Sequence, residues 1–528
     1  MPTSLHAPRP AYWAAQIGNG LLRRRGSRPV ALTAVLAILF LTFLDTTIVS
    51  VALGSIQNEL GAGVIPLQWV LNAYSLVFAS LMLVAGTLGD RLGRKWIMAA
   101  GIVVFCGGSV MCALAPTVGW VIGGRAVMGL GAAASEPGTL SVIRHLYPDR
   151  AQRARALGAW SAVSGLSLAL GPVIGALLVS LDDWRAVFWF NLGLGALLLI
   201  ALALYVPNSS DPQPGRLDGG GFLFGAVALG SLIYAGISGE EYGYSTWWII
   251  ALFVVSGLAG IAFVLVEHRV ISPMLDLRYL KDAAVSNALF AAMAIYFGVF
   301  SIFFLTALYL DVLLGYSGPR LAATFAPMAL AIVAGSVGSG FWVGLVGPRG
   351  PLIAGCALSG GGILAARAIL DAHPDFLALT LSLAAAGLGF GVAVVPLTSA
   401  VLGHVPAARS GMAASATNTA RQVGSVVGVA ALGAIVNSYL TNHLRDKLGS
   451  GGSFIINLLE TGGSEAAGQQ HNLANPPPVI KPIVDAAKEA FRTGLHAALL
   501  VSALLILLSA VITAVVPRGA LAPDTEFD

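Results

Sequence analysis

Long apolar runs recur along this chain and are separated by short polar segments. A hydrocarbon core about 30 Å thick needs roughly 20 apolar residues per helix, and about fourteen runs reach that length. The runs lie near residues 30–50, 69–88, 96–115, 119–142, 157–179, 187–206, 219–238, 247–266, 285–309, 321–343, 352–370, 377–400, 411–436 and 495–516. The pattern predicts an all-α integral membrane protein with 14 transmembrane helices.

Composition agrees with a membrane protein. Hydrophobic residues make up 57% of the 528 positions and charged residues only 10%, too few to cover soluble domains of this size. The net charge of +4 gives no support for nucleic-acid binding. The three cysteines, Cys106, Cys112 and Cys356, lie inside apolar runs without metal-ligand spacing, so we expect no metal site.

Basic residues concentrate in alternate loops, which predicts the orientation of the chain. These loops carry Arg23, Arg24, Arg25, Arg28, Arg91, Arg94, Lys95, Arg144, Arg150, Arg153, Arg155, Arg216, Arg269, Arg278, Lys281, Arg349, Arg409 and Arg518. The opposite short loops hold little beyond Arg185 and Arg320 and carry acids instead. The positive-inside rule therefore places both termini in the cytoplasm. Abundant arginine, alanine and glycine favour a bacterial source and hence a bacterial inner membrane.

The segment 86–95 joins the second and third runs and reads GTLGDRLGRK. One acid and three bases sit beside three glycines, so two helices must meet closely around charged groups. We predict a cytoplasmic gate whose residues are Gly86, Asp90, Arg91, Gly93 and Arg94, with Asp90 bonded to helix ends or cations. A loop that merely orients the protein is the alternative, but it explains neither the acid nor the glycine spacing.

A degenerate copy of this segment, GLVGPR, follows the tenth run at 344–349. Repeated helical bundles are common in secondary transporters. The chain then divides into a cytoplasmic arm 1–29, a six-helix bundle 30–206, two additional helices within 207–284, a second six-helix bundle 285–516 and a tail 517–528. The second bundle includes an outer loop, 437–493, whose last part reads either as an amphipathic helix or as a plain linker.

Further segments follow recognisable motifs. They are 44–53 (LDTTIVSVAL), 69–74 (WVLNAY), 125–131 (RAVMGLG), 165–175 (GLSLALGPVIG), 188–191 (FWFN), 308–311 (LYLD) and 410–424 (SGMAASATNTARQVG). Together with 86–95 they resemble the fourteen-helix drug:proton antiporters of the major facilitator superfamily, the group of QacA-like and EmrB-like exporters. The chain departs from that family at Met128 and Asp311, where glutamine is usual, and after Asn191, where glycine replaces the expected proline.

Three ionisable residues inside apolar runs are candidates for proton coupling. Asp45 is the best candidate, because a buried carboxyl near a cation can be tuned to exchange protons. The resemblance makes Arg125 its partner. Glu136 follows Arg125 by eleven residues, about three helical turns, and so faces the same side of that helix as a second proton site. A permanent structural pair remains the alternative for Asp45, and an acid facing the cytoplasm remains the alternative for Glu136.

The resemblance also implies a hinge in the fifth span at Gly165, Gly171, Pro172 and Gly175, where glycine admits close contact and proline removes a backbone donor. Sparse polar groups in an apolar cavity suit amphiphiles. The candidates for this substrate cavity are Asn72, Tyr74, Asp311, Ser415, Asn418 and Gln422. Polar contacts that only join helices are the alternative for these residues.

We therefore predict a proton-coupled secondary active exporter of lipophilic or cationic drugs and related amphiphiles, working by alternating access. A lipid or lipid-conjugate transporter of the same fold is the alternative. The chain lacks HExxH and GxSxG motifs and a Walker loop, which disfavours an enzyme and an ATP-driven pump; a channel explains the gating glycines poorly. Expected partners are the amphiphile, protons and membrane lipids. We expect a monomer with no cofactor and no nucleic acid.

Overall fold

The computed structural model describes residues 27–62, 64–181, 183–210, 218–270, 273–310, 314–316, 318–371, 374–448 and 481–516. All regular secondary structure in these residues is helical. Thirteen of the helices are long and apolar enough to cross a membrane, and the bent helix α7 (Arg150–Leu181) makes a fourteenth. The predicted all-α membrane fold with 14 spans is confirmed.

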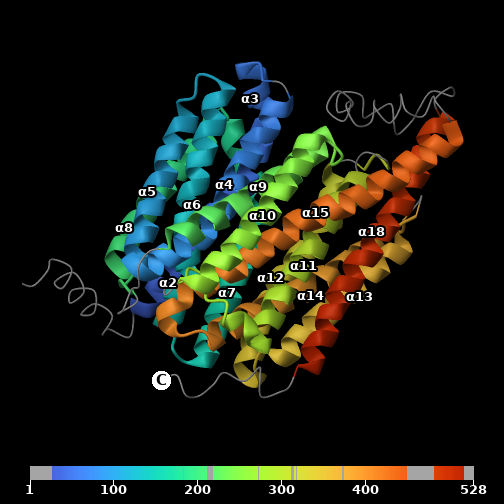
Figure 1. The fold of residues 1–528 in the computed structure, drawn as a ribbon. Helices are drawn as coiled ribbons and strands as arrows, with labels where there is room; N and C mark the ends of the chain where they lie inside the picture. The colour runs from blue at the N-terminus through green and yellow to red at the C-terminus, as the bar shows by residue number, and fades with distance from the viewer. Residues whose placement is uncertain are drawn as a thin grey trace, which may run out of the picture. The chain divides into compact units, whose positions relative to one another are not determined.

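Contacts divide the chain into two compact units. The first consists of the described parts of Met1–Asp149, Leu170–Arg216 and Pro406–Ser415. Its elements are α2 (Ser27–Ile48), η1 (Val49–Ala52), α3 (Leu53–Leu60), α4 (Val64–Leu92), α5 (Arg94–Ala113), α6 (Val118–Leu146), the end of α7, α8 (Arg185–Tyr205) and η4 (Ala407–Arg409). Helix α6 packs against α2, α4 and α5, and α8 packs against α2 and α5 (Figure 1).

Glycine sets the distance between α5 and α6. A methyl group at Gly108 would lie 2.7 Å from the carbonyl oxygen of Gly124, and one at Gly124 would lie 2.9 Å from that of Gly108. Only two glycines can meet so closely, since any larger residue would overlap backbone atoms of the neighbouring helix. This contact holds α6, which carries two of the candidate residues, at a fixed position in the first unit.

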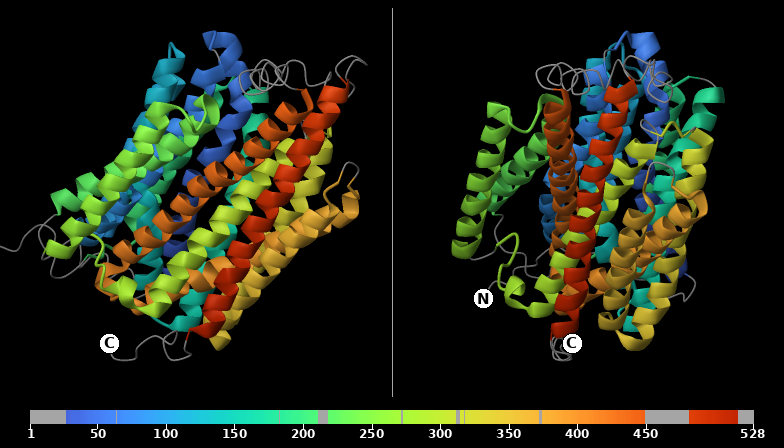
Figure 2. Two further views of the ribbon diagram at one scale, coloured as in Figure 1. Left: turned by 45° about the vertical axis from the view of Figure 1, so that its right-hand side comes forward. Right: turned by 90° about the vertical axis from the view of Figure 1, so that its right-hand side faces the viewer.

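The second unit consists of the described parts of Arg150–Ala169, Leu217–Val405 and Ala416–Asp528. It contains the first part of α7, α9 (Gly219–Tyr242), α10 (Trp247–Arg269), η2 (Tyr279–Lys281), α11 (Ala283–Leu308), α12 (Gly318–Val346), α13 (Arg349–Ile369), α14 (Phe376–His404), most of α15 (Ser410–Leu448) and α18 (Lys481–Val515). Helix α14 packs against α11, α12 and α13, and α18 packs against α11 and α13. Helices α9 and α10 run side by side (Figure 2).

Helix α10 presents large apolar side chains at its surface. Trp247, Leu258 and Ile261 are 79%, 63% and 60% exposed, respectively. A soluble protein would bury such groups, whereas a helix that faces lipid tails exposes them without cost. The exposed apolar surface of α10 therefore agrees with a membrane protein.

The helices on either side of the predicted outer loop 437–493 are longer than the sequence analysis expected. Helix α15 continues to Leu448, and the predicted amphipathic segment forms the first turns of α18 instead of a separate helix. Burial explains this continuity, because Ala486, Ala487 and Ala490 are buried and Phe491 stacks on Tyr309 with ring centroids 6.0 Å apart. Residues 449–480 lie outside the described part of the chain.

Candidate functional site

A buried ion pair joins two helices of the first unit. Asp45 of α2 and Arg125 of α6 are both 0% exposed, and Arg125 Nη1 donates to Asp45 Oδ2. Asn191 of α8 donates from Nδ2 to Asp45 Oδ1 at 2.7 Å, and Arg125 Nε donates to the carbonyl oxygen of Val70 in α4 at 2.9 Å. Both carboxylate oxygens of Asp45 therefore accept hydrogen bonds within a fully buried site.

Tyr74 of α4 lies against the same arginine. Its ring centroid is 4.5 Å from Arg125 Cζ, and its hydroxyl donates to the carbonyl oxygen of Thr42 at 2.8 Å. A methyl group at Gly129 would lie 2.5 Å from the carbonyl oxygen of Tyr74, so glycine at this position lets α4 approach α6. We refer to Asp45, Tyr74, Arg125 and Asn191 as the acid cluster.

Two members of the acid cluster, Asn191 and Tyr74, have contacts that the sequence did not predict. Asp45 and Arg125 were expected to be partners, and they are in contact. Asn191 was not predicted as a site residue, although an amide inside the apolar segment of α8 was a usable signal. Tyr74 was expected to line a substrate cavity, but its hydroxyl bonds to a backbone carbonyl and its ring faces Arg125. The roles of these residues in transport stay predictions.

Because the acid cluster is buried, an unpaired charge within it would be strongly destabilising. Removing one partner of a buried ion pair costs about 3–5 kcal/mol, because the remaining charge is left without a counter-ion. Protonation of Asp45 would neutralise its carboxylate while Arg125 stays in place. It would therefore leave Arg125 as an uncompensated buried cation and destabilise this arrangement of α2, α6 and α8.

Glu136 lies on α6, as predicted from its position in the fourth apolar run. It is 1% exposed, and the hydroxyl of Thr139 donates to its backbone carbonyl oxygen at 2.6 Å. This burial does not distinguish a proton site from an acid that faces the cytoplasm, so both stay open. The second proton site at Glu136 stays a prediction.

Asp90, near the end of α4, accepts four hydrogen bonds. Arg94 donates from Nε at 2.9 Å and from Nη2 at 2.7 Å to Oδ1, which also accepts from the backbone N–H of Gly411 at 2.9 Å. The backbone N–H of Met412 donates to Oδ2, also at 2.9 Å. Gly411 and Met412 belong to the first turn of α15, where N–H groups have no partner within the helix. The carboxylate thus holds a helix end and a cation, the two kinds of partner expected from the sequence.

Arg94 extends this contact. Its Nη2 also donates to the carbonyl oxygens of Ala407 and Ala408 at 3.0 Å each, and its Nη1 donates to the hydroxyl of Ser209 at 3.1 Å. The guanidinium therefore links α5 to the segment before α15. We refer to Asp90, Arg94 and the backbone of 407–412 as the gate contact.

The other predicted gate residues surround this contact. Gly93 has φ +103° between α4 and α5, a conformation that favours glycine. Arg91 lies in the last turn of α4. A methyl group at Gly86 would lie 2.6 Å from the carbonyl oxygen of Gly411 and would overlap the side chain of Ser415. Ser415, predicted as a cavity residue, is thus packed against α4 in the first unit, and its contact with cargo stays a prediction.

The predicted hinge residues of α7 have different neighbours. Methyl groups at Gly171 and Gly175 would meet α2, the second at 2.6 Å from the carbonyl oxygen of Ile48. A methyl group at Gly165 would lie 3.2 Å from Cγ2 of Ile332 in the second unit. The side chain of Pro172 lies outside the described residues. Helix α7 is bent by 46° between Arg150–Leu168 and Val173–Leu181, the region where the hinge was predicted.

The remaining cavity candidates are spread over the chain. Asn72 and Gln422 are half-buried, and Asp311 lies outside the described residues. Asn418 is buried and accepts a hydrogen bond from Arg421 Nη1 at 2.9 Å. Arg421 was not predicted as a site residue, although it is the only charged residue in the thirteenth apolar run.

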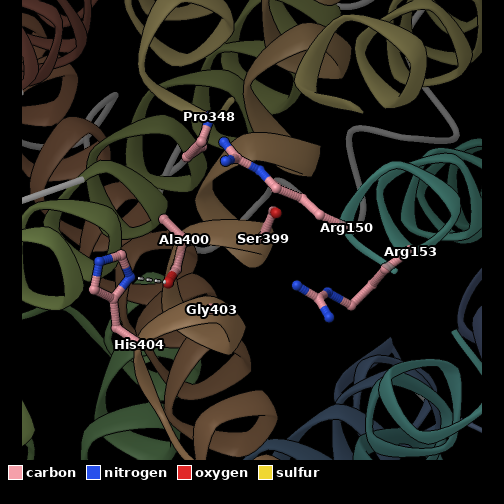
Figure 3. A pocket seen from close by; sticks show the side chains of 7 residues that line it. All are labelled: Arg150, Arg153, Pro348, Ser399, Ala400, Gly403 and His404. Carbon is pink, nitrogen blue, oxygen red and sulfur yellow. Dashed lines mark hydrogen bonds between the residues drawn. The ribbon is translucent and has the colours of Figure 1, made fainter. Parts of the chain in front are cut away.

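A small basic hollow lies at one end of α14 in the second unit. It is lined by Arg150, Arg153, Pro348, Ser399, Ala400, Gly403 and His404, and the ring of His404 is hydrogen-bonded to the carbonyl oxygen of Ala400 (Figure 3). Its empty volume of about 240 Å³, part of it open solvent, is below the roughly 300–1,000 Å³ of typical ligand sites. Its two arginines also make it unsuited to cationic cargo. We therefore do not assign it as the cargo site.

Comparison with known proteins identifies the family. A model described as the Major Facilitator Superfamily matches residues 35–429. Multidrug resistance protein Stp of Mycobacterium tuberculosis is 33% identical over 410 residues, covering 78% of this chain and 76% of Stp. Multidrug efflux pump LfrA of Mycolicibacterium smegmatis is 28% identical over 506 residues, covering 95% of this chain and 99% of LfrA.

A solved structure shares the fold. The human organic anion transporter MFSD10 superposes with a TM-score of 0.62 at 14% identity, covering 93% of this chain and 100% of that chain. At this identity the likeness concerns the fold alone. With the family match over most of the chain, these comparisons confirm the resemblance inferred from the motifs. The chain belongs to the major facilitator superfamily, as a multi-pass membrane transporter of small molecules related to its drug:proton antiporters.

Proposed function

We propose that this protein is a proton-coupled secondary exporter of lipophilic or cationic drugs and related amphiphiles. The observation that carries the proposal is the acid cluster, in which a carboxylate inside the span region is fully buried against one arginine. Ionisable groups in the membrane are costly and are usually kept for function. The relatives Stp and LfrA are named for multidrug resistance and multidrug efflux, which supports drugs over lipids as cargo.

Asp45 couples proton movement to conformation through Arg125. With Asp45 ionised, its two oxygens accept from Arg125 and Asn191, and the cluster is electrically balanced. A proton arriving at Asp45 removes this balance, and Arg125 then favours a conformation in which it meets other acceptors or water. Release of the proton on the opposite side restores the pair and the original conformation.

The conformational change of the transport cycle involves the gate contact and the predicted hinge of α7. Breaking the bonds from Asp90 to the first turn of α15 opens the cytoplasmic side, and the glycines of α7 move against α2 on the outer side. Asn72, Asp311 and the polar face of α15 offer the cargo sparse hydrogen bonds in apolar surroundings.

The orientation and the location of the protein are proposed from its loop charges and its relatives. Loop charges favour cytoplasmic termini, and the bacterial relatives favour a bacterial plasma membrane. We propose that the chain forms two six-helix bundles with an additional helix pair within 207–284. The protein acts as a monomer and contacts membrane lipids.

The test is proton-gradient-driven uptake of tetraphenylphosphonium into inverted vesicles, comparing the unchanged protein with Asp45→Asn. Asparagine keeps the shape of the side chain but cannot release a proton, so we expect gradient-driven uptake to fall to the level of vesicles without the protein. Glu59→Gln is the matched control. Glu59 also accepts from an arginine, Arg185, at 2.7 Å, but its side chain is 46% exposed.

Two results would overturn the proposal. Full gradient-driven uptake by Asp45→Asn would show that Asp45 is not the coupling acid. Gradient-driven movement of labelled phospholipid in the same vesicles, without movement of tetraphenylphosphonium, would favour lipid transport instead. Loss of uptake in Glu59→Gln as well would mean that any carboxylate change impairs the protein, so uptake retained in that control is part of the expected result.

A further inference from the structure

The second unit contains a buried arginine, Arg421, that has no acid beside it among the described residues. Arg421 of α15 is 5% exposed. Its Nη1 donates to Asn418 Oδ1 at 2.9 Å, and its Nη2 donates to the hydroxyl of Thr398 on α14 at 2.6 Å. Both acceptors are neutral, so the hydrogen bonds position the guanidinium without neutralising its charge.

Two aromatic rings complete the surroundings of this guanidinium. Arg421 Cζ lies 5.3 Å from the ring centroid of Trp160 on α7 and 5.6 Å from that of Tyr296 on α11. Tyr296 is itself held by Phe390, with ring centroids 5.1 Å apart. A cation over an aromatic face is stabilised, but less than by a carboxylate. Four helices of the second unit therefore converge on one partly compensated cation.

The two buried arginines Arg125 and Arg421 differ in their partners. Arg125 is neutralised by Asp45, whereas within the described residues no carboxylate pairs with Arg421. In that same part of the chain, Arg421 Nε is buried without a hydrogen-bond partner. A buried cation with a free donor is costly unless something supplies an acceptor. The guanidinium joins α15 to α14 through Thr398, and binding of an anionic group would supply the charge and the acceptor that it lacks.

We propose that Arg421, with Trp160 and Tyr296, forms a subsite for a carboxylate or similar anionic oxygen carried by an aromatic amphiphile. The planar guanidinium fork matches a carboxylate, and the two ring faces match a flat aromatic body. The cargo reaches this nearly buried group when the helices part during the transport cycle. The inference deepens the proposed export function, because it adds zwitterions and organic anions to the cationic cargo expected from the sequence.

The test uses two dyes that differ at a single group, rhodamine B, which has a free carboxylate, and its ethyl ester, which does not. Half-saturation concentrations for gradient-driven uptake into inverted vesicles are measured for both dyes with Arg421→Gln. A hydrogen-bonded charge pair supports about tenfold discrimination or more. We therefore expect the ratio of the rhodamine B value to the ester value to rise about tenfold or more over that of the unchanged protein.

Arg367→Gln is the matched control, because Arg367 lies in the same unit and its Nε donates to the carbonyl oxygen of His496 at 3.1 Å. We expect it to leave the ratio unchanged. An equal loss for both dyes in Arg421→Gln, or no change for either, would overturn the subsite. If Arg421→Gln does not fold, Arg421→Lys replaces it in the test. Lysine keeps the charge but lacks the planar guanidinium, so the ratio of the rhodamine B value to the ester value must still rise.

The outcomes separate this inference from the proposed function. If Asp45→Asn still takes up both dyes under a proton gradient, the coupling proposal fails while the effect of Arg421→Gln on the dye ratio can stand. If coupling depends on Asp45 but the ratio does not respond to Arg421, only the anionic subsite fails.

Discussion

The substitution Asp90→Asn tests the gate contact most directly. Asparagine has the shape of aspartate, and its amide oxygen can take the place of Oδ1, which accepts three of the four hydrogen bonds. The amide nitrogen then takes the place of Oδ2, which lies 2.9 Å from the backbone nitrogen of Met412. Two hydrogen-bond donors would face each other there. The change therefore removes one charge-assisted hydrogen bond, the attraction of a negative charge to the N-terminus of α15 and the counter-ion of the buried Arg94.

The size of the effect follows from these losses. A hydrogen bond to a charged group is worth about 1.5–3 kcal/mol, and the attraction to a helix N-terminus adds about 0.3–1 kcal/mol. Because the buried Arg94 also loses its counter-ion, the gate contact should weaken by about 3–5 kcal/mol, which is about a hundredfold to several thousand-fold in its closing equilibrium. Arg94 keeps its bonds to Ala407, Ala408 and Ser209, so the variant should fold.

Two measurements separate movement from binding. Turnover of tetraphenylphosphonium in inverted vesicles should fall by about tenfold or more, because the closed state is less populated. The dissociation constant of the same cation, measured by equilibrium dialysis on purified protein, should remain nearly unchanged. Glu489→Gln is the control, since its ion pair with Arg492 is half-exposed and worth at most about 1 kcal/mol. A variant Asp90→Asn that loses affinity yet turns over normally would refute the gate assignment.

Two further substitutions test the first unit. Gly175→Ala puts a methyl group against the carbonyl oxygen of Ile48, so we expect a loss of about 1–3 kcal/mol, seen as a lower Tm in detergent. Gly193→Ala, which has open space around it, should leave Tm unchanged; equal Tm values for both variants would contradict the tight contact. Arg125→Lys keeps the charge but not the fork that reaches both Asp45 and a backbone carbonyl, and should abolish gradient-driven uptake. Full uptake by this variant would mean that charge alone is enough.

The order of apolar runs was sufficient to predict the number of membrane helices. A span must satisfy its backbone within itself and match the hydrocarbon thickness, so each run signals its helix without reference to any other part of the chain. The same local logic singled out Asp45 and Arg125, because a charge inside an apolar run is visible in one dimension. It was less reliable at helix ends, where α15 and α18 extend beyond their apolar runs through contacts with other helices.

The partners of Asp90 on α15 and the contact of Asn191 with Asp45 were decided by the tertiary structure alone. Asp90 bonds to N–H groups 321 and 322 positions away, and Asn191 reaches Asp45 across 146 positions. A hydrogen bond depends on distance and direction in space, which helix packing sets and a local pattern does not record. The sequence determined the membrane fold and, through the family resemblance, the pairing of Asp45 with Arg125. Only packing decided that Asp90 holds the first turn of α15 and that Arg421 meets neutral and aromatic groups.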